Sequence, residues 1–156
     1  MQTNFEEKSA TMLMINKTAF LTVAALLSAA PPVSAQEPNA PQSLNIPASQ
    51  IKWIDLGGPQ LGTVWGDSAK GAHGSFLRLP KGFVSPAHHH TGDYYGVIVE
   101  GSVTNAEAEQ REVVLGPGSY YVQKGKAEHV TKCVGDTDCL IYISQSKPFD
   151  FIPSAK

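Results

Sequence analysis

Short apolar segments that alternate with turn residues constrain the fold of this chain more than any other feature. From Ile51 onwards these segments are about five to seven residues long, and Gly, Pro and Asp residues separate them. They span residues 51–56, 61–65, 73–79, 83–90, 94–100, 102–106, 111–115, 119–123, 128–133, 139–144 and 149–152. Strands of this length at regular spacing are typical of an all-β sandwich or barrel. Because this region shows no long apolar period of 3.6 residues, we predict a single all-β barrel over residues 51–156.

The N-terminus has the pattern of a secretory signal peptide. Lys17 precedes an apolar run at residues 19–30, and a small-x-small cleavage pattern ends at Ala35. We therefore expect residues 1–35 to be removed and the remainder to be periplasmic or secreted. The run is shorter than the about 20 residues of a membrane span, so stable membrane insertion after cleavage is not expected. An uncleaved anchor is the alternative.

Residues 36–50 are expected to be a flexible lead-in to the barrel. Three prolines lie there among Asn, Ser and Gln residues, a composition that favours no regular element. The polar stretch at residues 1–11 is unusual ahead of a signal peptide, so Met12 and Met14 are alternative starts of the chain.

Charge and length exclude some classes of function. The chain has 156 residues, which suits one domain, and its formal net charge is −2 with no basic block. Binding of nucleic acid through a positively charged surface is therefore not expected.

The two cysteines enclose a short polar turn. Cys133 and Cys139 are the only cysteines of the chain, and in an oxidising compartment such a pair forms a disulfide. A free thiol pair and a cysteine-based metal site are the alternatives. The metal site is disfavoured because only two thiolates are available.

Two of three consecutive histidines are predicted to share one face of a strand. Side chains alternate along a strand, so His88 and His90 point the same way and His89 points away. Two imidazoles at this spacing can chelate one divalent metal, and His129 could supply a third nitrogen from another strand. Such a set suits zinc, iron, copper or nickel, whereas calcium and magnesium prefer oxygen. A surface cluster of histidines without metal is the alternative.

The segment that contains these histidines resembles the first sequence motif of the cupin superfamily. Gly82, His88, His90 and Gly101 fall in register with that motif. The motif expects glutamate where this chain has Tyr94. A set of two histidines and one carboxylate favours ferrous iron. Without the carboxylate, the remaining histidines also suit zinc and copper.

The segment that follows resembles the second cupin motif. Gly118 and His129 have the expected separation. Lys124 and Lys126 replace the expected proline and glycine, and a turn glycine comes one place early, as Gly125. The resemblance covers essentially all of residues 51–152.

A narrower resemblance comes from residues 65–67, 93–97, the cysteine pair and residues 148–151. These are similar to uncharacterised cupins of the DUF4437 type, which are related to the cupin part of ChrR-like zinc anti-sigma factors. The resemblance implies a single cupin barrel, also called a double-stranded β-helix or jelly-roll, with a metal at its inner wall. It also implies a homodimer, because cupins are often dimeric. Cupin chemistry is diverse, so the fold does not select the reaction.

The resemblance assigns candidate roles to five residues. His88, His90 and His129 are the expected ligands of one divalent transition metal, zinc or iron first, with copper and nickel as alternatives. Tyr94 is the candidate catalytic residue, because its hydroxyl could donate a hydrogen bond to a bound substrate or water; a packed aromatic side chain is the alternative. Asp93 is the nearest carboxylate that could replace the missing glutamate, and a turn residue otherwise.

These observations predict an exported metal-binding cupin that acts as a mononuclear metalloenzyme on a small organic molecule in the barrel. The chemistry would be that of an oxygenase with iron, or zinc-dependent chemistry with zinc. The alternative is a sensing or ligand-binding module without turnover, like ChrR. A metal-free structural or carbohydrate-binding barrel is a third interpretation.

Overall fold

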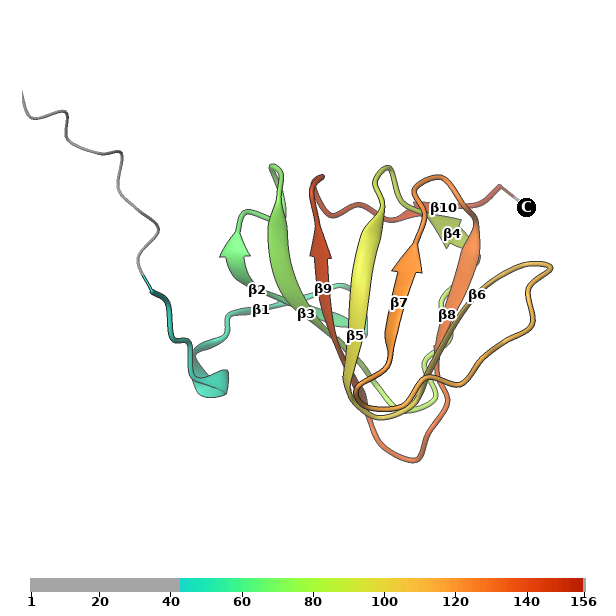
Figure 1. Ribbon diagram of the computed structural model, residues 1–156, viewed down its shortest axis with the longest axis horizontal. Helices are drawn as coiled ribbons and strands as arrows, with labels where there is room; N and C mark the ends of the chain where they lie inside the picture. Colours follow the sequence, from blue (N-terminus) through green and yellow to red (C-terminus); the bar gives the residue numbers. More distant parts are fainter. Residues whose placement is uncertain (1–42, 156) are drawn as a thin grey trace, which may run out of the picture. The chain divides into compact units, whose positions relative to one another are not determined.

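The computed structural model describes residues 43–155, which form ten β-strands and one short 3-10 helix (Figure 1). The predicted signal peptide and residues 36–42 of the lead-in lie outside the described residues. Within the rest of the lead-in, residues 43–50 are exposed, and the short helix η1 (Ala48–Gln50) is their one regular turn. Among the described residues no helix has the length and apolar character needed to cross a membrane.

The strands form two antiparallel sheets, as Figure 1 shows. The six-stranded sheet has, in spatial order, β1 (Trp53–Asp55), β2 (Gln60–Gly66), β3 (His73–Leu79), β9 (Cys139–Gln145), β5 (Tyr94–Glu100) and β7 (Tyr120–Gln123). The four-stranded sheet has β10 (Ile152–Pro153), β4 (His88–His89), β8 (His129–Cys133) and β6 (Val103–Glu107). The prediction of an all-β fold from the spacing of apolar segments is confirmed.

The core lies between the two sheets and follows from alternation along the strands. Strand β9 buries every second residue from Cys139 to Gln145, and β5 buries Tyr94 and Ile98 in the same way. Ile141 and Ile143 of β9 are fully buried, and each contributes about 1.5–3 kcal/mol relative to an exposed side chain. Strand β9 holds β3 on one side and β5 on the other, so it is the centre of the six-stranded sheet.

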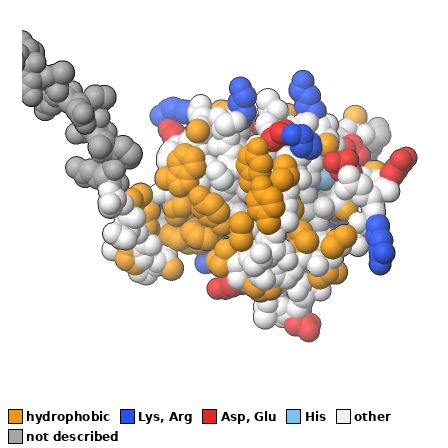
Figure 2. Space-filling view, viewed as in Figure 1, with side chains coloured by type: hydrophobic (Ala, Val, Ile, Leu, Met, Phe, Trp, Pro, Cys, Tyr) orange, Lys and Arg blue, Asp and Glu red, His pale blue; other side chains and the backbone are white. Residues whose placement is uncertain are grey.

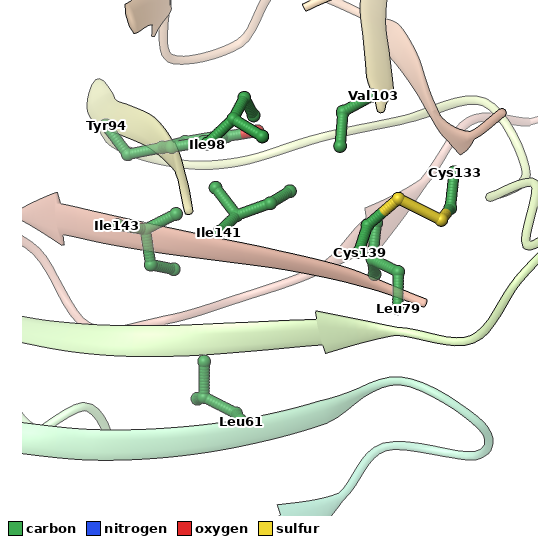
Figure 3. Packing of buried hydrophobic residues seen from close by; sticks show 9 residues of the cluster. All are labelled: Leu61, Leu79, Tyr94, Ile98, Val103, Cys133, Cys139, Ile141 and Ile143. Carbon is green, nitrogen blue, oxygen red and sulfur yellow. A yellow bond between two sulfur atoms is a disulfide. The ribbon is translucent and has the colours of Figure 1, made fainter. Parts of the chain in front are cut away.

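A disulfide closes one end of this core. Cys133, the last residue of β8, is bonded to Cys139, the first residue of β9, so the predicted pairing is confirmed. Figure 3 shows this bond beside Leu79 at one end of the core cluster, with Tyr94 and Ile143 at the other end. Because β8 runs from His129 to Cys133, the histidine lies at the end away from the disulfide.

Three predicted strands differ clearly from the structure. The segment at residues 149–152 is a strand only from Ile152, in β10. The segment at residues 83–90 is a strand only at His88–His89, because Pro86 has no N–H to donate to a neighbouring strand. The segment at residues 111–115 is not a strand: Val113 and Val114 are largely exposed, and only Leu115 forms a bridge, with Val103. Its β-branched residues favour a strand, but no partner strand lies beside them.

Candidate metal centre

Three buried histidines meet on the inner side of the four-stranded sheet. His88 and His129 are paired residues on β4 and β8, and His90 follows β4 directly. Their exposed fractions are 3%, 5% and 1% for His88, His90 and His129. His89 lies on the opposite side of β4, half-buried and paired with Ile152 of β10. The predicted division of the three consecutive histidines between two faces matches this arrangement.

A backbone carbonyl fixes the ring orientation of each histidine in the cluster. The Nδ1 atom of His88 lies 2.9 Å from the carbonyl oxygen of Pro86, and that of His129 lies 3.1 Å from Ala127 O. The Nδ1 atom of His90 lies 2.5 Å from the carbonyl oxygen of Asp150. An imidazole that donates its Nδ1 hydrogen to a carbonyl keeps the Nε2 lone pair for another partner. This second-layer contact is typical of histidines that bind metals.

The three donor atoms are close enough to share one ion. One ligand nitrogen from each of His88, His90 and His129 lies within 4.8 Å of the other two. Two nitrogens that each lie about 2.1 Å from a metal are at most about 4.2 Å apart, so small side-chain adjustments would complete the coordination. Among the described residues no other group of three potential ligands meets in this way. The donor set therefore fits one divalent transition metal, with positions left open for water or substrate.

Burial keeps these imidazoles neutral, which is the form that binds metal. Loss of solvation is the main cause that lowers the pKa of His88 and of His90, against weaker opposing effects of the Pro86 and Asp150 carbonyls. The same cause lowers the pKa of His129 to about 4. Neutral imidazoles need no proton release before they coordinate, so metal uptake is favoured at neutral pH.

Tyr94 borders the histidine cluster from the six-stranded sheet. It begins β5, is buried, and its hydroxyl oxygen lies 3.5 Å from Nε2 of His129. Burial raises the pKa of Tyr94 to about 12, so without a bound metal the phenol stays protonated at neutral pH and can donate a hydrogen bond. The ring also packs edge-on against His90 and Tyr121, so Tyr94 has a packing role as well.

The structure does not bring Asp93 into the cluster. Its carboxylate forms an ion pair with Lys124 and accepts the N–H of Gly125 at 2.7 Å, and these two contacts lower its pKa. Asp93 therefore connects the turn before β5 to the turn after β7, and the described residues supply no carboxylate in place of the missing glutamate.

His73 shows that burial and a carbonyl contact alone do not make a metal site. It is fully buried at the start of β3, and its Nδ1 lies 2.9 Å from the carbonyl oxygen of Gly71. Its Nε2 has no hydrogen-bond partner among the described residues, and no second histidine joins it there.

Two histidines of the cluster line a cavity of about 390 Å³. His88, His90 and Tyr94 form its inner end, and Leu56 of the β1–β2 loop lies at its rim. The C-terminal segment supplies a further wall, where Phe151 stacks on His88 with ring centroids 4.1 Å apart. The cavity gives a small organic molecule access to two of the three histidines, His88 and His90.

Four residues of the site were not predicted from the sequence. Phe149 and Phe151 line the cavity, and Asp150 between them supplies the carbonyl that orients His90. The alternation of aromatic and polar residues in this segment is the one signal that could have placed both rings on a common side. Ser85 is buried behind His88, and its hydroxyl oxygen lies 3.3 Å from Nδ1 of that histidine.

The two-sheet barrel and the three inward-facing histidines define the molecule as a cupin. This class agrees with the motifs at residues 82–101 and 118–129. The family described as a domain of unknown function, DUF4437, matches residues 34–156, and the chain belongs to this family. The narrower resemblance drawn from the sequence is thereby confirmed.

Solved structures support the fold assignment. An RmlC-like cupin protein from Ralstonia eutropha has a TM-score of 0.57 and 18% identity, over 68% of this chain and 69% of that chain. The polyketide cyclase RemF from Streptomyces resistomycificus has a TM-score of 0.62 and 13% identity, over 74% and 87% of the two chains. A chain from the complex of Rhodobacter sphaeroides SigE with the anti-sigma ChrR has a TM-score of 0.50 and 20% identity, over 64% of this chain and 51% of that chain. No curated protein matches the sequence.

Proposed function

We propose that this protein is a mononuclear metalloenzyme that acts on a small organic molecule in the barrel. The observation that carries the proposal is the convergence of three buried, neutral imidazoles, two of which, His88 and His90, line the inner end of an open cavity. A site with three protein ligands and open positions is typical of catalytic metal centres, whereas structural centres are closed. His88, His90 and His129 would hold zinc or iron, with copper or nickel as alternatives.

The protein's own groups would bind and orient the substrate. A divalent metal at this site supplies Lewis-acid chemistry, or redox chemistry if it is iron. Tyr94 remains protonated, and its hydroxyl is close to Nε2 of His129, so it would donate a hydrogen bond to a substrate oxygen at the cluster. Phe149 and Phe151 would exclude water from the side of the C-terminal segment. The shared fold with the polyketide cyclase RemF is consistent with catalytic use of such a barrel.

The second candidate is a metal-dependent sensing or ligand-binding module without turnover. The likeness to a chain of the SigE–ChrR complex favours it. The test is a turnover screen of the metal-loaded protein against small ketones, diketones and organic acids, with and without a chelator. Turnover that the chelator abolishes, and that Tyr94→Phe reduces with unchanged metal content, supports the enzyme. Ligand binding without product in every case would reject it and favour the sensor.

We further propose that the protein is exported and forms a homodimer. The N-terminal apolar run and the Cys133–Cys139 disulfide support export, because disulfides persist in oxidising compartments. An exposed apolar patch on β5 and β7, formed by Tyr95, Val97, Tyr120 and Val122, supports self-association. Figure 2, viewed as Figure 1, shows apolar side chains gathered on the face of the molecule where the six-stranded sheet lies.

A further inference from the structure

The cavity beside the histidines is lined by uncharged side chains, and this restricts the ligand that it accepts. Among the described residues that line it, none is Asp, Glu, Lys or Arg. We propose that the cavity binds a neutral, ring-containing organic molecule with one oxygen-bearing group, and that without a bound metal it discriminates against carboxylates. This inference rests on the proposed function, since it takes the cavity as the ligand site.

The walls fit a flat apolar body. Leu79 and Ile143, both nearly fully buried, line the cavity from the six-stranded sheet. Three phenylalanines, Phe83, Phe149 and Phe151, line it from loops and the C-terminal segment. Aromatic side chains pair with rings in stacked or edge-on geometry, which favours a cyclic ligand over a flexible polar one. A volume of about 390 Å³ lies in the lower part of the range for small-molecule sites and suits one or two rings.

Most polar groups of the walls already have partners within the protein. Ser85 accepts the N–H of Thr131 at 3.0 Å, and the Thr131 hydroxyl donates to Asn105 at 2.6 Å. The amide nitrogen of Gln145 donates to a backbone carbonyl 3.1 Å away. The inner end, where the protonated hydroxyl of Tyr94 can donate a hydrogen bond, is therefore the place where a ligand oxygen is recognised. One oxygen-bearing group at one end of the ligand satisfies this arrangement.

Nearby charges do not compensate a ligand carboxylate. The guanidinium of Arg78 is exposed and stacks 4.2 Å from the ring centroid of Trp53, and Lys132 forms an ion pair with Glu112. The carboxylate of Asp150 lies 3.7 Å from Nδ1 of His90 and adds negative charge beside that ring. A carboxylate that enters the metal-free cavity would lose water without gaining a cationic side chain.

Binding of two ligands of nearly equal shape to the metal-free protein tests this inference. The probes are 2-acetylnaphthalene, a neutral ketone, and 2-naphthoate, the carboxylate of the same ring system. Dissociation constants are measured at pH 8 by calorimetry after the full protein has been stripped with a chelator. We expect the ketone to bind at least about tenfold more tightly, because burial of an unpaired charge is unfavourable. Equal or tighter binding of the naphthoate, or no binding of the ketone up to its solubility limit, would overturn the inference.

A cation introduced at the rim gives a second readout. Leu56→Lys places an ammonium at the cavity mouth, and we expect it to reduce the preference for the ketone about threefold. The matched control is Ile54→Lys, because Ile54 is similarly exposed on β1 but does not line the cavity. An equal effect of both variants would contradict the assignment of the binding site.

The two proposals can fail separately. Because the ligand measurements use metal-free protein, a preference for the ketone without any metal uptake rejects the metalloenzyme alone. Normal metal uptake with a preference for the naphthoate in the metal-free form rejects the neutral-ligand inference alone.

Discussion

Removal of the disulfide should destabilise the barrel by an amount that the chain geometry sets. The bond joins residues with a sequence separation of 6, at the turn between β8 and β9. In the chain-entropy relation, a loop of this length corresponds to about 2.2 kcal/mol at 25 °C. For a domain of this size, that loss corresponds to a decrease of about 10 °C in Tm. Because Cys133 and Cys139 are both buried, a Cys133→Ser/Cys139→Ser variant should lose at least this much.

The assay is unfolding in urea, followed by circular dichroism, for the oxidised protein, the reduced protein and the double serine variant. The reduced protein is the matched control, because it keeps both sulfur atoms in the core and isolates the effect of the covalent bond. Metal content should not change, since His129 lies at the opposite end of β8 from Cys133. If the reduced and oxidised proteins unfold at the same urea concentration, the reasoning from loop entropy is wrong.

Three further predictions concern pH, backbone strain and assembly. Burial lowers the pKa of His129 to about 4, from an unfolded value near 6.5, so the unfolded chain binds this proton more readily between these values. The free energy of unfolding of the metal-free protein should therefore be highest above pH 6.5 and should fall as the pH falls towards 4. In urea unfolding, this fall should be smaller for His129→Gln. A native protein whose free energy of unfolding does not fall over this range would contradict the prediction. Lys126 has a φ of 66°, a strained conformation for a side chain other than glycine, so Lys126→Gly should increase the free energy of unfolding by about 0.5–1 kcal/mol. The control Lys52→Gly should not increase it. A larger increase for Lys52→Gly than for Lys126→Gly would show that the backbone at Lys126 is not strained. Tyr120→Lys should shift a dimer to monomer in sedimentation equilibrium and Val113→Lys should not, and an unchanged mass for both would exclude the β5–β7 patch as the interface.

The sequence predicts those parts of the fold that alternation and turn residues specify. Strands β3 and β5 have the predicted bounds, because proline follows β3 directly and glycine follows β5 directly, and β5 also buries alternate residues. The strand expected at residues 111–115 fails, because β propensity does not reveal whether a partner strand lies alongside. The strand expected at residues 83–90 is shortened by Pro86, a local signal that the apolar pattern concealed.

The site is predictable only in part, for a similar reason. The shared face of His88 and His90 follows from the period of two residues along a strand, and the third histidine from its spacing in a known motif. The carbonyl of Asp150 that orients His90 is 60 residues away, and any residue type carries a carbonyl, so the sequence holds no signal for it. The position of Phe151 over His88 depends on the pairing of β10 with β4, which is a tertiary contact.

The central claim is that imidazoles from β4 and β8 hold one ion, and elemental analysis of tag-free protein after metal loading tests it most directly. We predict one zinc or iron atom per chain in the native protein, the same in His89→Ala, and none in His90→Ala or His129→Ala. His89 is the matched control, because it lies between two of the ligands in sequence but on the opposite side of β4. Native protein that takes up no metal, or a His90→Ala variant that keeps a full equivalent, would contradict the account.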